Sequence, residues 1–109
     1  HCLQCRKTTG SYVMATSCHR DDLVWTGDIT WYRSSETARR GFCGVCGGNL
    51  FWDGPGDNIS IFAGTIDGET GLRLAGHIFC AWKGDFYEIA DGTPQAAEAH
   101  PRLTTMVRR

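Results

Sequence analysis

The sequence lacks the features that mark a membrane or secreted protein. No apolar run approaches the roughly 20 residues needed to cross a bilayer, and no charged segment followed by an apolar leader opens the chain. An excess of one charge is also missing, because 11 basic residues balance 12 acidic ones and give a formal net charge of −1. The basic side chains are scattered apart from Arg39–Arg40 and Arg108–Arg109. We therefore expect a cytoplasmic protein without a nucleic-acid or membrane partner.

Proline is scarce, with three residues, and internal repeats, linkers and low-complexity tracts are absent. Apolar residues make up 41% and charged residues 21%, which is ordinary usage for a folded globular chain. With 109 residues, two halves would each be too small to bury an adequate core. The sequence therefore predicts one domain over residues 1–109.

Helical periodicity is almost missing, whereas short segments rich in β-branched and aromatic residues recur. They predict an all-β domain of short antiparallel strands. The expected strands are residues 12–15, 23–25, 29–32, 50–52, 59–63, 77–82 and 86–89. One short helix is predicted near the C-terminus, at residues 93–99, because Thr93 suits an N-cap and Pro94 the first helical position. Basic residues do not alternate with the aromatic ones, so we interpret the aromatic side chains as core and not as a base-stacking surface.

Cysteine, in contrast, is abundant. The six cysteines lie at positions 2, 5, 18, 43, 46 and 80, and four of them form two C-x-x-C pairs. Such pairs in a chain without a leader are more typical of metal knuckles than of disulfides. The segment Cys43–Gly48 has the form of a zinc knuckle, since glycine after the second cysteine permits the positive φ that aims N–H groups at the sulfurs. A redox pair would precede a helix, but a strand-like segment follows here.

The second pair, Cys2 and Cys5, is followed by Arg6 and Lys7, whose charges favour thiolates. The two pairs are separated by residues 6–42, an interval longer than the ~15–20 residues of common zinc ribbons. The spacing therefore allows either one shared Cys₄ site or two separate metal sites.

The remaining cysteines, Cys18 and Cys80, lie in strand-like segments and are interpreted as small buried hydrophobic residues. His77 is interpreted as a hydrogen-bonded structural histidine. A place for it near an open zinc is the alternative.

Several motifs in order along nearly the whole chain carry a resemblance to a known family. They are His1-Cys2-x-x-Cys5-Arg6-Lys7-x-Thr9-Gly10-Ser11, Gly41-Phe42-Cys43-x-x-Cys46-Gly47-x-x-Leu50-Phe51-Trp52, Ala63–Asp67, His77–Phe79 with Lys83, and Tyr87-x-Ile89-x-Asp91-Gly92-x-Pro94. Together they resemble the glutathione-dependent formaldehyde-activating enzymes, a family that includes centromere protein V.

The resemblance implies a β-tent domain with two zinc sites. In the family, an early C-x-C joins a later C-x-x-C in a closed structural site, and a C-x-C-x-x-C segment gives three ligands to an open zinc. Cys43 and Cys46 match the structural pair, and Cys2 and Cys5 match two ligands of the open site. The cysteine expected before His1 and the upstream C-x-C strand are not in this sequence. We expect them in the natural protein, so the chain lacks N-terminal strands relative to the family.

The function implied by the resemblance is that of a zinc-dependent carbon–sulfur lyase or synthase. It would act on an adduct of a small thiol such as glutathione with an aldehyde, of the S-hydroxymethylglutathione type. Cys2 and Cys5 would be the catalytic metal ligands and would favour capture of the thiol. Arg6 and Lys7 are candidates to bind the substrate carboxylates, and a solvated pair is the alternative. A non-catalytic zinc module that binds a protein partner or a thiol is the competing function.

Overall fold

The computed structural model describes residues 1–103, and the chain divides into two compact units. Unit 1 contains residues 1–14 and 71–103, and unit 2 contains residues 15–70. Within the described residues, one antiparallel sheet and a single short α-helix form the regular structure, so the predicted all-β class is confirmed. No helix in this part of the chain is both long enough and apolar enough to cross a membrane. The expectation of one domain over residues 1–109 stays a prediction, and Arg108–Arg109 lies outside the described residues.

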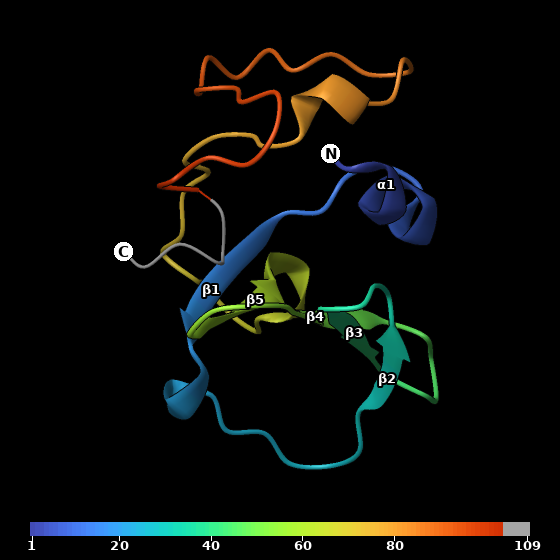
Figure 1. The fold of residues 1–109 in the computed structure, drawn as a ribbon. Helices are drawn as coiled ribbons and strands as arrows, with labels where there is room; N and C mark the ends of the chain where they lie inside the picture. Colours follow the sequence, from blue (N-terminus) through green and yellow to red (C-terminus); the bar gives the residue numbers. More distant parts are fainter. Residues whose placement is uncertain (104–109) are drawn as a thin grey trace. The chain divides into compact units, whose positions relative to one another are not determined.

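Unit 2 is built on a five-stranded sheet with the order β1-β5-β4-β3-β2 (Figure 1). Consecutive strands β3, β4 and β5 pair as a meander, β2 adds to one side of it and β1 to the other. Short 3₁₀ turns, η1 and η2, follow β1 and β5. The bounds are β1 Ala15–His19, η1 Arg20–Asp22, β2 Thr30–Arg33, β3 Arg39–Phe42, β4 Asn49–Asp53, β5 Asn58–Phe62 and η2 Ala63–Thr65.

The core of unit 2 gathers around β5, which pairs on both sides. Ile59 is 4% exposed, and Phe62 on the same strand and Phe51 on β4 are also buried. The Trp31 ring of β2 stacks on Phe51 with centroids 6.3 Å apart. The strands predicted at 29–32, 50–52 and 59–63 are confirmed within one or two residues, since β-branched and aromatic side chains favour strands.

Strand β3 was not predicted, since two arginines and a glycine carry little β propensity. Its position between β2 and β4 supplies the pairing instead. Gly41 lies opposite Trp31, and the register shifts between Gly41 and Phe42. A Cβ at position 41 would lie 2.9 Å from Trp31 Cζ3 and 3.1 Å from Ile29 Cγ2. Glycine is therefore required for the Trp31 ring to pack against this strand.

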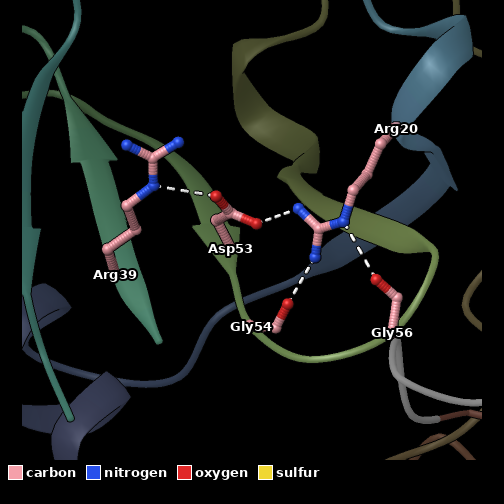
Figure 2. Close-up of polar contacts among 5 residues, drawn as sticks. All are labelled: Arg20, Arg39, Asp53, Gly54 and Gly56. Carbon is pink, nitrogen blue, oxygen red and sulfur yellow. Dashed lines mark hydrogen bonds and ion pairs between the residues drawn. The ribbon is translucent and has the colours of Figure 1, made fainter. Parts of the chain in front are cut away.

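An ion-pair network links η1 to the end of β4 (Figure 2). The Arg20 guanidinium donates to Asp53 Oδ1, to the Gly54 carbonyl and, at 2.9 Å, to the Gly56 carbonyl. Arg39 Nε donates to Asp53 Oδ2 at 2.8 Å. Burial raises the pKa of the Asp53 carboxyl, but the hydrogen bonds from Arg39 and Arg20 outweigh it and leave the pKa below its usual range. The same side chains line a shallow pocket of about 340 Å³ on unit 2.

Unit 1 contains the helix α1 (Leu3–Thr9), the 3₁₀ turn η3 (Cys80–Trp82) and irregular chain (Figure 1). Gly10 ends α1 in the left-handed region with φ 84°, and its N–H donates to the Arg6 carbonyl. The α-helix predicted at residues 93–99 is wrong. Backbone groups of that segment bond residues 77–81, through His77 N–H to Pro94 O, Ala96 N–H to His77 O, Phe79 N–H to Glu98 O, Cys80 N–H to Ala96 O and Ala81 N–H to Ala97 O.

Four of the predicted strands need correction. The first expected strand, at 12–15, begins at Ala15 as β1. Residues 23–25 form no strand, and Val24 is 86% exposed because the chain there runs outside the sheet. Residues 77–82 form one parallel bridge, between His77 and Gln95, and then η3, while 86–89 are irregular. Apolar runs in unit 1 therefore pack without forming a ladder.

Candidate functional site

The first cysteine pair lies at the start of α1. Cys2 is the N-cap residue, and its Sγ accepts the backbone N–H of Cys5 at 3.3 Å. Both thiols are half-buried. The two cysteines are three residues apart at the start of the helix. The turn therefore presents two soft ligands, one of them already holding an N–H···S bond of the kind found in metal knuckles.

The two basic residues after the pair occupy the last turn of α1. Arg6 is half-buried, and Lys7 is exposed. Positive charge near a helix C-terminus is stabilised by the carbonyl groups there, which gives the pair a structural reason to be basic. Their role in binding substrate carboxylates stays a prediction.

The second pair sits in a tight turn that follows β3 in unit 2. The Cys43 N–H donates to the Gly48 carbonyl at 2.9 Å, and the Gly47 N–H returns to the Cys43 carbonyl at 2.7 Å. Gly47 has φ 77°, as the sequence predicted for a glycine after the second cysteine. The Gly48 N–H points at Cys46 Sγ, 3.4 Å away. This turn has the backbone arrangement of a zinc knuckle.

The turn also favours the thiolate form of Cys43. Backbone N–H groups of Cys46 and Val45, and then the Cys46 thiol, lower the pKa of the Cys43 thiol. Hydrogen bonds to a sulfur stabilise its thiolate, which is the form that binds metals. Cys43 is half-buried and Cys46 is exposed.

Zinc is the metal that these donors suit, since thiolates in C-x-x-C turns are its common ligands. Donor type and turn geometry therefore fit, but each pair supplies two of the usual four ligands. Within residues 1–103, no three His, Cys, Asp or Glu side chains lie together in a group that could hold a metal ion. Cys2 and Cys5 belong to unit 1, and Cys43 and Cys46 belong to unit 2.

Unit 1 also contains a chain of four hydrogen-bonded side chains. His1 Nδ1 lies 2.5 Å from the Tyr87 hydroxyl, and His1 Nε2 lies 2.8 Å from His77 Nδ1. His77 Nε2 lies 2.7 Å from Asp91 Oδ2. The two histidines are 8% and 5% exposed, so both buried imidazoles are satisfied at both nitrogens. His1, one of the two inner members of this series, immediately precedes Cys2 in the sequence.

Asp91 closes this chain on the side of the solvent. Its Oδ1 accepts the Thr93 N–H at 3.0 Å and the Thr93 hydroxyl at 2.8 Å. The hydrogen bond from His77, followed by the two from Thr93, lowers the pKa of Asp91 to about 2. Its side chain is 39% exposed. The carboxylate is therefore ionised at neutral pH and acts as an acceptor for three donors.

Aromatic and cationic neighbours contact the rings of His1 and Tyr87 in this hydrogen-bonded series. The Tyr12 ring centroid lies 4.3 Å from that of His1 and 5.2 Å from that of Tyr87. Lys83 Nζ lies 4.7 Å from the Tyr87 ring centroid and donates to the carbonyls of Gly84 and Tyr87. The backbone nitrogen of His1 donates to the Ile78 carbonyl at 3.3 Å. Residues from three parts of unit 1 thus orient the His1 and Tyr87 rings.

Sequence reasoning located part of this arrangement. The interpretation of His77 as a hydrogen-bonded buried histidine is confirmed. Cys18 and Cys80 are half-buried and not fully buried, and burial followed by the charge of Asp22 raises the pKa of the Cys18 thiol. Tyr87 and Asp91 were assigned no site role, although both stood in the motif Tyr87-x-Ile89-x-Asp91. Nothing local in the sequence says that these side chains meet His1 and His77.

The comparisons with known proteins agree with the cysteine motifs. A family model described as glutathione-dependent formaldehyde-activating enzyme matches residues 1–82, three quarters of the chain. None of the curated proteins searched matches it. The matched region includes both C-x-x-C pairs and His77 and ends before Tyr87 and Asp91. By its sequence over these 82 residues, the chain belongs to the glutathione-dependent formaldehyde-activating enzyme family.

Proposed function

We propose that the chain captures a small thiol such as glutathione at a zinc site built on Cys2 and Cys5, and that it acts as a carbon–sulfur lyase or synthase on the formaldehyde adduct of this thiol. The observation that carries the proposal is the pair of half-buried thiols one turn apart at the start of α1, with an N–H bond on the Cys2 sulfur. Family membership supports glutathione and formaldehyde as the substrates.

The chemistry needs the sulfur of the substrate as a thiolate. Cys2 and Cys5 would hold the metal with ligands from outside the pair, and zinc when bound supplies positive charge that favours the thiolate of a sulfur ligand. In the addition, the sulfur electron pair forms the C–S bond and the C=O π pair moves to oxygen, which takes a proton. The released thiol proton balances the one taken up, and the lyase direction reverses each change. Arg6 and Lys7 are proposed to bind substrate carboxylates.

The pair Cys43 and Cys46 is proposed to hold a second, structural zinc. Its turn is fixed by backbone hydrogen bonds at both ends, and glycine at position 48 leaves room for Cys46 Sγ, which would lie 3.3 Å from a Cβ there. A site of this kind adds its binding free energy to folding.

Glutathione binding tests the proposal directly. We expect isothermal titration to show binding to the zinc-loaded protein and to Cys80→Ser, a control that removes a thiol of unit 1 outside the pair, and no binding to Cys5→Ser. A hundredfold excess of glutathione over its Kd should stabilise the protein by about 2.7 kcal/mol. NMR exchange between formaldehyde and glutathione then measures turnover above the uncatalysed addition. Binding without acceleration would leave a non-catalytic thiol-binding module, and absence of binding would contradict the proposal.

A further inference from the structure

We propose that unit 2 binds a phosphate group, free or as a phosphate monoester, in the shallow pocket formed by η1, the β2–β3 hairpin and the end of β4. The pocket has a volume of about 340 Å³, enough for a small ligand. All of its lining residues belong to unit 2 and none is a cysteine, so the proposal does not depend on the proposed thiol site.

Positive charge is in excess in this pocket. Five of its lining residues are charged: Arg20, Arg33, Glu36, Arg39 and Asp53. Three guanidinium groups against two carboxylates leave one net positive charge. Asp53 is already shared, because its Oδ1 accepts from Arg20 and its Oδ2 from Arg39 (Figure 2). The inner carboxylate therefore serves two arginines and leaves the third without a partner of opposite charge there.

The strand register places two of these arginines directly opposite each other. Arg33 at the end of β2 pairs with Arg39 at the start of β3, and Arg39 pairs on its other side with Asp53 of β4. Like charges opposite each other on neighbouring strands are destabilising. Within residues 1–103, the Arg33 guanidinium has one hydrogen bond, from Nη2 to the backbone carbonyl of Glu36 at 2.9 Å. An anion bound beside both arginines would offset their repulsion.

Arg39 is held in a position from which it can donate two further hydrogen bonds. Its Nε donates to Asp53 Oδ2 at 2.8 Å, and its Cζ lies 3.7 Å from the centroid of the Trp31 ring. These contacts fix one edge and one face of the guanidinium group. In Figure 2 its two terminal nitrogens lie beyond the edge that Asp53 contacts, and no described residue accepts a hydrogen bond from them. The side chain is 48% exposed, so this edge is free for two oxygens of one ligand.

The positions of the donors suit a tetrahedral oxyanion. One guanidinium fork can satisfy both oxygens of a carboxylate, whereas a phosphate monoester has three terminal oxygens that point in different directions. Arg33 and Arg39 approach the pocket from two strands, and Thr37 in the loop between them adds a hydroxyl group. Glu36 is exposed on the same loop, and its charge opposes any anion. Phosphate is therefore the ligand that these side chains recognise, with Glu36 limiting its affinity.

The first experiment titrates the full chain with inorganic phosphate at constant ionic strength and follows ¹H–¹⁵N NMR signals. We expect saturable shifts of Arg39 Nε–H and of the Thr37 and Gly54 amides. Glycerol 3-phosphate distinguishes the two sources: its binding supports a site for phosphate monoesters, and binding of inorganic phosphate alone supports a site for the free anion. Acetate should bind several-fold more weakly. Equal affinity for acetate would overturn the assignment to phosphate, and shifts that do not saturate would overturn the site.

The second experiment uses variants with effects of opposite sign. Arg33→Gln and Arg39→Gln should each weaken phosphate binding by roughly tenfold, the equivalent of one charge-assisted hydrogen bond. Glu36→Gln removes the opposing charge and should tighten binding by roughly twofold to fivefold. Arg73→Gln is the matched control, because it makes the same change of charge at an exposed position of unit 1 that does not line the pocket.

The outcomes do not depend on the stability of one variant. Arg33 and Glu36 are exposed, so their variants carry the test if Arg39→Gln disturbs the contact with Asp53. Equal effects of Arg33→Gln and Arg73→Gln would show a response to net charge alone and would overturn the proposal, as would weaker binding by Glu36→Gln. Failure of the wild type to bind glutathione would contradict the proposed function and leave the phosphate site standing.

Discussion

Asp91 shows how one partly exposed carboxylate organises two buried histidines. It accepts a hydrogen bond from His77 Nε2 at 2.7 Å, and His77 Nδ1 in turn lies 2.8 Å from His1 Nε2. The carboxylate is itself held by two bonds from Thr93. A residue outside the cysteine motifs therefore helps to orient His77 and, through it, the ring of His1, which precedes Cys2 in the sequence.

This arrangement predicts an acid-sensitive contribution to stability. Folding lowers the pKa of Asp91 to about 2, below the ~3.9 of an unfolded chain. The contribution is thus complete above the unfolded value and is lost as pH falls from about 4 through 2. We expect Asp91→Asn to lower the Tm at pH 6, with the difference from wild type shrinking over that interval. Asp85→Asn, at an exposed position in the same unit, should not show this pH dependence. A difference in Tm that does not change with pH would contradict the linkage.

At the scale of the elements, side-chain type predicted the strands that are rich in β-branched and aromatic residues and missed the one that is not. The apolar residues of Ile59–Phe62 predicted β5, and two of them, Ile59 and Phe62, are buried in the core of unit 2. Arg39 and Arg40 give no such signal, and β3 exists because two neighbouring strands satisfy its backbone. Long-range pairing of this kind is not written in the local sequence.

The two helix errors have different causes. The α1 helix carries usable signals, a side-chain N-cap at Cys2 and a left-handed Gly10, but the metal-ligand pattern of the segment dominated its interpretation. Residues 93–99 carry good helix signals, yet their backbone groups bond residues 77–81. At residues 93–99, hydrogen bonds to a distant segment therefore outweigh the local helix propensity.

The cysteine pairs of the candidate site were predictable from the sequence, whereas the contacts of His1 were not. Both cysteine pairs are contained in single turns, so their spacing was enough to locate them. The side-chain contacts of His1 with His77 and Tyr87 join residues 76 and 86 positions apart. Only the folded unit brings those side chains together.

Strand β3 offers a direct test of close packing. Gly41→Ala would place a Cβ within 2.9 Å of the Trp31 ring, and we expect it to destabilise unit 2 by about 1–3 kcal/mol. Gly64→Ala is the matched control, since nothing lies within 4 Å of a Cβ there and its φ is not positive. Urea unfolding measures both. Equal stability of the two variants would show that the Trp31 ring moves aside freely.

At the scale of the whole molecule, each unit contains one cysteine pair. We expect elemental analysis of protein purified without chelator to give about two zinc ions per chain, and about one after loss of either pair. A single zinc in the wild type would instead favour one site shared by Cys2, Cys5, Cys43 and Cys46.

The two pairs should also differ in their effect on folding. Cys46→Ser removes a ligand from the proposed structural site and should lower the Tm sharply, whereas Cys2→Ser should affect mainly metal content and thiol binding. Indole NMR signals report on each unit separately, because Trp25, Trp31 and Trp52 lie in unit 2 and Trp82 lies in unit 1. Cys18→Ser controls for loss of a thiol in unit 2. Equal shifts of all four indoles in both variants would contradict the division of roles.

The strand order of unit 2 bears on how the protein behaves when it is concentrated. Within the described residues, β1 and β2 each pair with one strand only and form the two borders of the sheet. Border strands template fibrils when their unpaired edges are long, flat and exposed. Here they span five and four residues, and β2 ends in Arg33. Short borders offer a neighbouring strand few backbone groups to pair with, so we expect little edge-to-edge association of this sheet when the protein is concentrated.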